Sequence, residues 1–235
     1  MTSSWDLRPP DRLDAAIADT PCDLISDPGA AELEWTPAGQ DWQDVALQLR
    51  LLLSRGTSLA IATVVGMRGA VIRPPGTVLV VTEAGETIGF NPAGPLDGAI
   101  RDLAGQALAT GQDKLQRLRI EQDAAGYIGL SGQISLDIHA MRVDAADPAF
   151  GAMLRYLDSG AAAVLIIGTR GVAECAVVGA DRVVGQPDRP SLPSPVIQDA
   201  RHMLGCHRTA SRTYRPGGEK AGTGIRVWMA SYPQA

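Results

Sequence analysis

The segment from residue 59 to residue 100 reads LAIATVVGMRGAVIRPPGTVLVVTEAGETIGFNPAGPLDGAI, and this segment decides the fold. Two apolar runs, residues 59–65 and 77–81, have the length and composition of β-strands. Because these runs are nearly continuous, without strict alternation, they indicate strands buried on both faces of a sheet. A helix is expected from Pro95 to about Thr110, since proline suits a first turn and Gly111 provides a stop. Loops rich in glycine and proline therefore lie at the ends of two central strands.

The same kinds of element recur along the chain. Periodicity predicts further helices at 42–53, at 150–157 with a stop at Gly160, and at 195–204. It also predicts further strands at 114–120, 132–141, 163–167, 173–178, 208–215 and 224–230. Short motifs also recur: Gly66–Gly69 resembles Gly168–Gly171, and Thr82–Gly89 resembles Gly179–Gly185. The order helix, strand, strand, helix, strand, strand thus occurs twice, which indicates a duplicated unit.

These patterns predict an α/β fold with a mixed sheet. Two related αββαββ halves, residues 41–145 and 146–235, are expected to form one domain about a pseudo-twofold axis. Residues 1–40 are rich in Asp, Pro, Ala and Gly and show weak periodicity, so they are expected to form an extended N-terminal arm.

The composition of the chain narrows the classes of function. The 235 residues carry a formal net charge of −5 and include 4% aromatic residues. This charge does not attract nucleic acid or an anionic membrane, so neither is expected as a partner. The three cysteines, at positions 22, 175 and 206, fit neither a disulfide framework nor a CxxC metal site, and the chain does not open on a signal peptide. Reduced thiols and a cytoplasmic location are therefore expected.

The glycine- and proline-rich loops form the candidate binding site. The planar guanidinium of Arg73 suits a bound anion, but it equally suits a surface carboxylate or a turn. The pair Pro75–Gly76 suits a binding loop or any tight turn. Asn91 and Gly94 precede a helix whose first amides favour an anion, whereas Asp97 is an ordinary acid of a first turn. Nothing in the spacing of nucleophiles, carboxylates or histidines points to catalysis, so neither catalytic residues nor a metal site are expected.

A family resemblance rests on the same loops. The strand at 60–65, followed by Gly69 and by the sequence RPPG at 73–76, resembles the opening signature of the XdhC/CoxI family. These are accessory proteins for molybdenum-containing hydroxylases such as xanthine dehydrogenase and carbon monoxide dehydrogenase. Residues 89–100 and 129–132 are similar to two later family segments, so the resemblance extends over about residues 45–185.

The resemblance implies a non-catalytic maturation factor or chaperone. Such a factor would bind a molybdopterin-type molybdenum cofactor, or the hydroxylase that receives it, and would aid insertion of the cofactor. The implied partners are the apo-enzyme of a molybdenum hydroxylase or its maturation proteins, and the sequence leaves open whether the chain forms a homodimer. The residues that the resemblance makes candidates for cofactor binding are Arg73, Pro75, Gly76, Asn91, Gly94, Asp97, Ser131 and Gly132.

Departures from the family pattern bear on the mechanism. Pro95 stands where the first family cysteine is expected, and Leu130 and Ser131 stand where another is expected. No GxGxxG motif follows a strand, so the C-terminal dinucleotide-type domain of the family is not expected in this sequence. Chemistry that needs a thiolate at these positions is therefore not expected. The alternative is a scaffold or protein-interaction member of the family that no longer binds cofactor.

Overall fold

A computed structural model describes residues 39–68, 74–89, 96–120, 134–170, 175–185, 192–206, 208–214 and 225–232. The first half of the chain contains α1 (Gly39–Ser54), β1 (Leu59–Arg68), β2 (Val78–Thr82), β3 (Thr87–Gly89), α2 (Asp97–Thr110), β4 (Lys114–Ile120) and β5 (Ile134–Val143). The second half contains α4 (Pro148–Ser159), β6 (Ala163–Arg170), β7 (Cys175–Gly179), β8 (Val183–Gly185), α5 (Ser194–His202), β9 (Thr209–Tyr214) and β10 (Ile225–Tyr232). The duplicated order is confirmed, although each half has one more short strand than predicted, β3 or β8.

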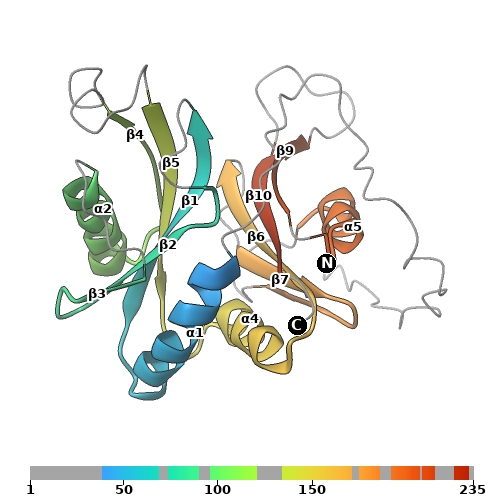
Figure 1. Ribbon diagram of the computed structural model, residues 1–235, viewed down its shortest axis with the longest axis horizontal. Helices are drawn as coiled ribbons and strands as arrows, with labels where there is room; N and C mark the ends of the chain where they lie inside the picture. Colours follow the sequence, from blue (N-terminus) through green and yellow to red (C-terminus); the bar gives the residue numbers. More distant parts are fainter. Residues whose placement is uncertain are drawn as a thin grey trace, which may run out of the picture.

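Each half forms its own five-stranded sheet (Figure 1). The strand orders, β3-β2-β1-β5-β4 and β8-β7-β6-β10-β9, are equivalent. Every pairing between the described strands is antiparallel. The α/β class is therefore confirmed, but the expectation of a mixed sheet is wrong. Parallel neighbours need a long crossover, and the connections β1–β2 and β2–β3 are too short to provide one.

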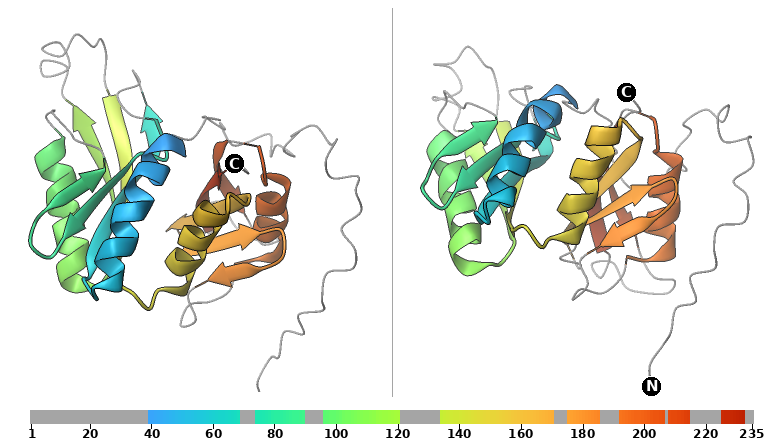
Figure 2. Two further views of the ribbon diagram at one scale, coloured as in Figure 1. Left: turned by 60° about the horizontal axis from the view of Figure 1, so that its bottom comes forward. Right: turned by 90° about the horizontal axis from the view of Figure 1, so that it is seen from below.

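Helices lie both between the two sheets and outside them. In Figures 1 and 2, α1 and α4 lie side by side between the sheets, while α2 covers the outer face of the first sheet and α5 that of the second. The central layer forms one apolar core that both halves share, and Leu49, Phe150 and Trp228 are fully buried in it. Separate cores lie beneath α2 and α5. This layering buries β1 and β2 on both faces, as their continuous apolar runs predict.

The ends of the helices follow from local sequence. The Asp147 side chain accepts a hydrogen bond from the Phe150 amide at 3.0 Å and so caps the start of α4. Gly111 ends α2 and Gly160 ends α4, each in the left-handed conformation that glycine adopts without strain. The predicted stops are therefore confirmed at these glycines.

The strand register defines which residues of the two halves are equivalent. In β1 the pairing with β5 shifts between Val64 and Gly66, so that Val65 is the additional residue of a β-bulge. The pairing of β6 with β10 shifts in the same way around Thr169. Gly66 is consequently equivalent to Arg170, and the alignment of Gly66 with Gly168 that the motifs suggested is wrong by two residues.

Several predictions concern parts of the chain beyond the sheets. The arm expected at residues 1–40 lies outside the described residues except for its last two, which already belong to α1, and the division into arm and domain stays a prediction. Among the helices within the described ranges, none meets the length and hydropathy that a bilayer span requires. Cys175 is buried and forms no disulfide bond, whereas Cys206 takes part in one, which corrects the expectation of a reduced thiol at position 206.

Candidate functional site

Two connections of the first half leave the sheet at the same end. Arg68, the last residue of β1, lies opposite Ser135 near the start of β5, and Ile120 at the end of β4 lies opposite Ile134. β3 runs antiparallel to β2 and ends, at Gly89, beside the start of β2. Connection 90–95 starts short of this end, because Gly89 is level with Ala62 of β1 and with Lys114 at the start of β4. The connections 69–73 and 121–133 start from the end of the sheet that carries Arg68 and Ile120, the upper end in Figure 1, which we call the loop end of the first sheet.

Pro75 and Gly76 belong to a tight turn between β1 and β2. Gly76 has a φ of 100°, which favours glycine, and its amide donates to the Val64 carbonyl at 2.8 Å. The Thr77 amide and hydroxyl donate to the Pro74 carbonyl at 3.2 and 2.9 Å. Pro75 and Gly76 are both buried in this turn. The structure thus gives them a role in closing the hairpin, and a role in cofactor binding stays a prediction.

The other predicted site residues lie at the margins of the described regions. Asp97 is the first residue of α2, and its side chain is outside the description. The remaining five, Arg73, Asn91, Gly94, Ser131 and Gly132, lie outside the described residues. The structure places the ends of β1 and β4 at one end of the sheet, and the eight-residue site itself stays a prediction.

A pocket of about 320 Å³ lies between the two halves. We call it the inter-half pocket, and its lining residues are Val65, Leu115, Arg117 and Asp137 of the first half and Thr169, Ser211 and Arg226 of the second. The strand register makes six of these residues three equivalent pairs: Val65 with Thr169, Leu115 with Ser211, and Asp137 with Arg226. The pocket is therefore lined by equivalent strand positions of the two halves.

One wall of the inter-half pocket carries a bidentate ion pair. Arg117 Nε donates to Asp137 Oδ1 at 2.6 Å, and Arg117 Nη2 donates to Asp137 Oδ2 at 2.8 Å. These hydrogen bonds raise the pKa of Arg117 above its ordinary value. Gly66 leaves room for the carboxylate, because a Cβ at this position would lie 3.1 Å from Asp137 Oδ2. The pair joins neighbouring strands β4 and β5 on the face that looks toward the second half.

The opposite wall carries a second arginine. Arg226 is exposed, and within the described part of the chain it forms no ion pair. Thr169 Oγ1 donates to the Arg226 carbonyl at 3.2 Å, and Ser211 Oγ donates across the halves to the Val65 carbonyl at 3.3 Å. Two guanidinium groups and one carboxylate give the pocket one net positive charge.

The sequence reasoning missed the residues of this pocket. Arg117, Asp137 and Arg226 each adjoin a residue that packs in an outer core, so they lie on the other face of their strands; alternation was recognised for β4 and β5 but not for β10. The signal that the sequence offered for this pocket was a charged residue on the strand face opposite the outer core. Nothing in the sequence, however, indicates that the inner faces of the two halves meet at these residues.

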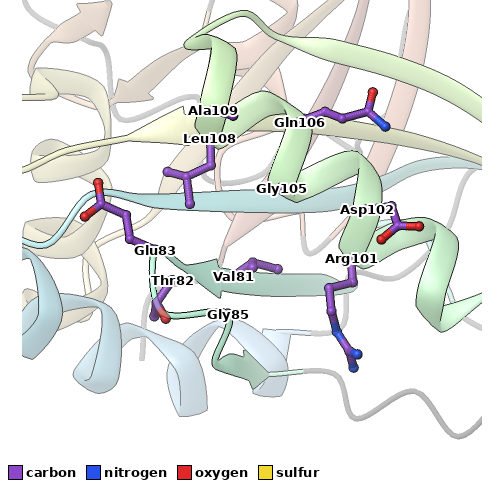
Figure 3. Close-up of a pocket in the computed structure, with 10 residues that line it drawn as sticks. All are labelled: Val81, Thr82, Glu83, Gly85, Arg101, Asp102, Gly105, Gln106, Leu108 and Ala109. Atoms are coloured by element: carbon purple, nitrogen blue, oxygen red, sulfur yellow. The ribbon is translucent and has the colours of Figure 1, made fainter.

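A second hollow lies on the outer surface of the first half. It has a volume of about 760 Å³ and lies between α2 and the turn that joins β2 to β3. Figure 3 shows that its polar side chains diverge: Arg101 points away from Glu83, and Gln106 points out on another side. A ligand site needs polar groups that converge on one volume, so this hollow is a surface groove.

Two polar clusters of the second half tie elements together. Asp199 on α5 accepts hydrogen bonds from Arg212 Nη1 and the Tyr214 hydroxyl on β9, both at 2.6 Å. Burial, together with the bond to Asp199, raises the pKa of Tyr214 well above its ordinary range. The Tyr156 hydroxyl of α4 donates to Asp181 in the β7–β8 turn at 2.6 Å. Both clusters link a helix to its own sheet, which is a structural role.

The described regions contain no cluster of metal-ligating side chains. Within residues 39–232, excluding the stretches outside the description, no three His, Cys, Asp or Glu side chains gather in a group suited to a metal ion. His139 is buried, and its Nε2 lies 3.8 Å from Asp113 Oδ2.

Residues 52–119 match the model of the XdhC and CoxI family. This segment is an XdhC/CoxI family domain. The XdhC/CoxI domain extends from the last turn of α1 into β4, so it includes the connections 69–73 and 90–95 and the pocket residue Arg117. Of the resemblance expected over residues 45–185, the part at residues 52–119 is therefore confirmed.

The fold that contains the XdhC/CoxI domain also occurs in a solved structure. A protein from Bacillus halodurans, described as a xanthine dehydrogenase, aligns with a TM-score of 0.53 and 15% identity over 80% of this chain and 52% of that protein. At this identity the alignment shows a shared fold alone. The chain spans about half the length of that structure. Among curated proteins, none matches the chain significantly.

Proposed function

We propose that the chain is a non-catalytic accessory factor for a molybdenum-containing hydroxylase. In this proposal it binds the molybdopterin-type cofactor, or the apo-enzyme that receives the cofactor, and aids insertion. The observation that carries the proposal is the XdhC/CoxI domain at residues 52–119, because this family comprises accessory proteins for such enzymes.

The arrangement of strand ends supports a site at the loop end of the first sheet. Arg73, Ser131 and Gly132 belong to connections that start from this end, although they are distant in the sequence. Functional residues commonly lie on loops that a rigid sheet positions in this way.

The turn after Arg73 supports a role for this arginine. Four hydrogen bonds fix the residues from Pro74 to Thr77 to β1 and to one another. The chain that follows Arg73 consequently rejoins the sheet through a hydrogen-bonded turn. In the proposal, the guanidinium of Arg73 pairs with a phosphate or with the pterin of the cofactor, and its planar fork suits bidentate hydrogen bonds.

An alternative function follows from the missing thiols. Pro95, Leu130 and Ser131 occupy positions where the family pattern leads to cysteines. A scaffold that recruits the hydroxylase or its maturation proteins, without binding cofactor, needs no thiolate at these positions. This alternative keeps the fold and the partners but not the cofactor.

Co-migration in gel filtration tests the proposal as a whole. The full chain is mixed with isolated molybdenum cofactor in one experiment and with a cofactor-free hydroxylase in another. Co-migration with the cofactor supports the binding function, and co-migration with the apo-enzyme alone supports the scaffold. Failure of both to co-migrate would overturn the proposed function.

Arg73→Ala separates the two functions in cells that depend on the factor for hydroxylase activity. Loss of hydroxylase activity is expected if Arg73 holds the cofactor, and full activity is expected for the scaffold. Arg101→Ala is the matched control, because Arg101 is an exposed arginine of the same half on the outer face of α2. This control is expected to retain activity.

A further inference from the structure

We propose that the inter-half pocket binds a small organic carboxylate, with Arg226 as the cation that anchors it. The inference uses only the residues that line this pocket and does not rest on the accessory function. Its test measures direct binding to the protein alone, so its failure and the failure of the accessory function are distinguishable.

The two halves present different charges at equivalent positions of the pocket. Asp137 and Arg226 occupy the same register position after the bulges of β1 and β6. On β4, Arg117 lies opposite Asp137 and neutralises its carboxylate. On the equivalent strand β9, the residue opposite Arg226 is the uncharged Thr213. The duplication therefore leaves one compensated charge pair and one cation without a carboxylate partner among the described residues.

The charge of the pocket favours a monoanion. The Arg117–Asp137 pair is neutral as a unit, so a single carboxylate on Arg226 balances the remaining charge. A guanidinium binds a carboxylate through two parallel hydrogen bonds. A phosphate dianion would leave excess negative charge close to Asp137, and like charges at short range destabilise a complex.

The other lining groups suit the body of an organic molecule. Val65 and Leu115 supply apolar surface, and the Leu115 side chain is 49% exposed. The hydroxyls of Thr169 and Ser211 donate to backbone carbonyls, so their lone pairs remain able to accept a hydrogen bond from a ligand. A volume of about 320 Å³ is at the small end of the range for ligand pockets.

The experiment titrates the full chain with benzoate, which combines a carboxylate with a small apolar ring. We expect saturable changes in the amide NMR resonances of residues around the pocket, such as Thr169 and Ser211. Benzamide has the same shape without the charge, and we expect it to bind at least about tenfold more weakly. Arg226→Gln should weaken benzoate to a similar extent, while Arg142→Gln, an exposed β5 arginine outside the pocket, should bind benzoate as the wild type does.

A second variant and a competing anion complete the test. Leu115→Trp fills the pocket from an exposed position and is expected to abolish benzoate binding in a protein whose circular dichroism is unchanged. Equal benzoate affinities of the wild type and Arg226→Gln would overturn the proposal. So would the lack of saturable benzoate binding, or displacement of benzoate by inorganic phosphate at lower concentrations, which would assign the pocket to phosphate.

Discussion

Gly89 offers a strict test of the packing argument at the end of β3. It is the last residue of β3, has a φ of 92°, and immediately precedes connection 90–95. A Cβ at this position would lie 2.9 Å from Val45 Cγ2 on α1 and 2.9 Å from the Val78 carbonyl oxygen. Neither neighbour moves freely, because Val45 is fully buried in the central core and Val78 is paired with Thr63 in the sheet. Gly89→Ala therefore strains the backbone and crowds a packed contact.

The two effects set the expected size of the loss. A left-handed conformation costs a residue with a Cβ about 1–2 kcal/mol. Overpacking of a close-packed core costs typically about 1–3 kcal/mol. Both arise from the same methyl group, so relaxation that relieves one partly relieves the other. We therefore expect Gly89→Ala to lower the free energy of unfolding by roughly 2–4 kcal/mol.

Gly105→Ala is the matched control for this prediction. Gly105 lies within α2, and a Cβ there meets no other atom within 4 Å. Replacing glycine within a helix by alanine is expected to raise the free energy of unfolding by about 0.5–1 kcal/mol. The same substitution thus has opposite signs at the two positions.

Urea unfolding followed by tryptophan fluorescence measures the free energy of unfolding of both variants. An unchanged dependence of this free energy on urea concentration would show that the unfolded state is the same in the variants and the wild type. A Gly89→Ala protein within about 0.5 kcal/mol of the wild type would refute the packing argument. Loss of function at unchanged stability would equally refute it, because the glycine would then serve a ligand and not the contact with α1.

Three further predictions test other regions. On α1, Leu47→Lys is expected to change the free energy of unfolding by less than about 0.5 kcal/mol, because Leu47 is 71% exposed. Leu49→Ala should lower the free energy of unfolding by about 2–5 kcal/mol, because Leu49 is fully buried, and equal losses in urea unfolding would contradict the orientation of the helix. A double-mutant cycle with Arg117→Ala and Asp137→Ala is expected to give a coupling energy of roughly 1 kcal/mol, the upper end for a partly exposed pair, and additive effects would show that the pair contributes nothing. Burial and the hydrogen bond to Asp181 raise the pKa of Tyr156 from 10.0 to about 12, so the stabilising contribution of Tyr156 is complete below pH 10 and is lost as the pH rises toward 12. The difference in free energy of unfolding between the wild type and Tyr156→Phe should therefore shrink over this pH range, and a constant difference would contradict the raised pKa.

The elements of the fold were predictable because local patterns specify them. Continuous apolar runs identified β1 and β2, and glycines identified the ends of α2 and α4. The ends of strands were less accurate, since β1 continues to Arg68 and β10 to Tyr232, beyond the apolar runs. Backbone hydrogen bonds to a neighbouring strand, not side-chain hydropathy, determine where a strand ends.

The directions of the strands show a signal that was present but unused. The connections from β1 to β2 and from β2 to β3 are too short for a parallel crossover, which alone argues for antiparallel neighbours. The pairing of β1 with β5 is different, because α2 and β4 separate these strands in the sequence. No local pattern specifies such a partner, and the order of the sheet consequently needed the structure.

The inter-half pocket depends on how the inner faces of the two halves meet, which periodicity does not predict. Alternation places Asp137 on the face of β5 opposite Leu136 and Ile138, and Arg226 on the face of β10 opposite Val227. Which surface each face meets depends on how α1 and α4 hold the two sheets apart, and this distance is a property of the shared core. The sequence therefore contains the charges of the pocket but not their proximity.

The connection of both halves in one chain explains how such a pocket arises. If two identical subunits met about a true twofold axis, equivalent positions would carry the same residue, and two aspartates or two arginines would line the pocket together. Like charges so placed repel, which weakens the contact between subunits. In a duplicated chain the positions vary independently, so one half keeps the Asp137–Arg117 pair while the other places Arg226 beside it. The asymmetric charge that makes the pocket suited to an anion is thus a consequence of duplication within a single chain.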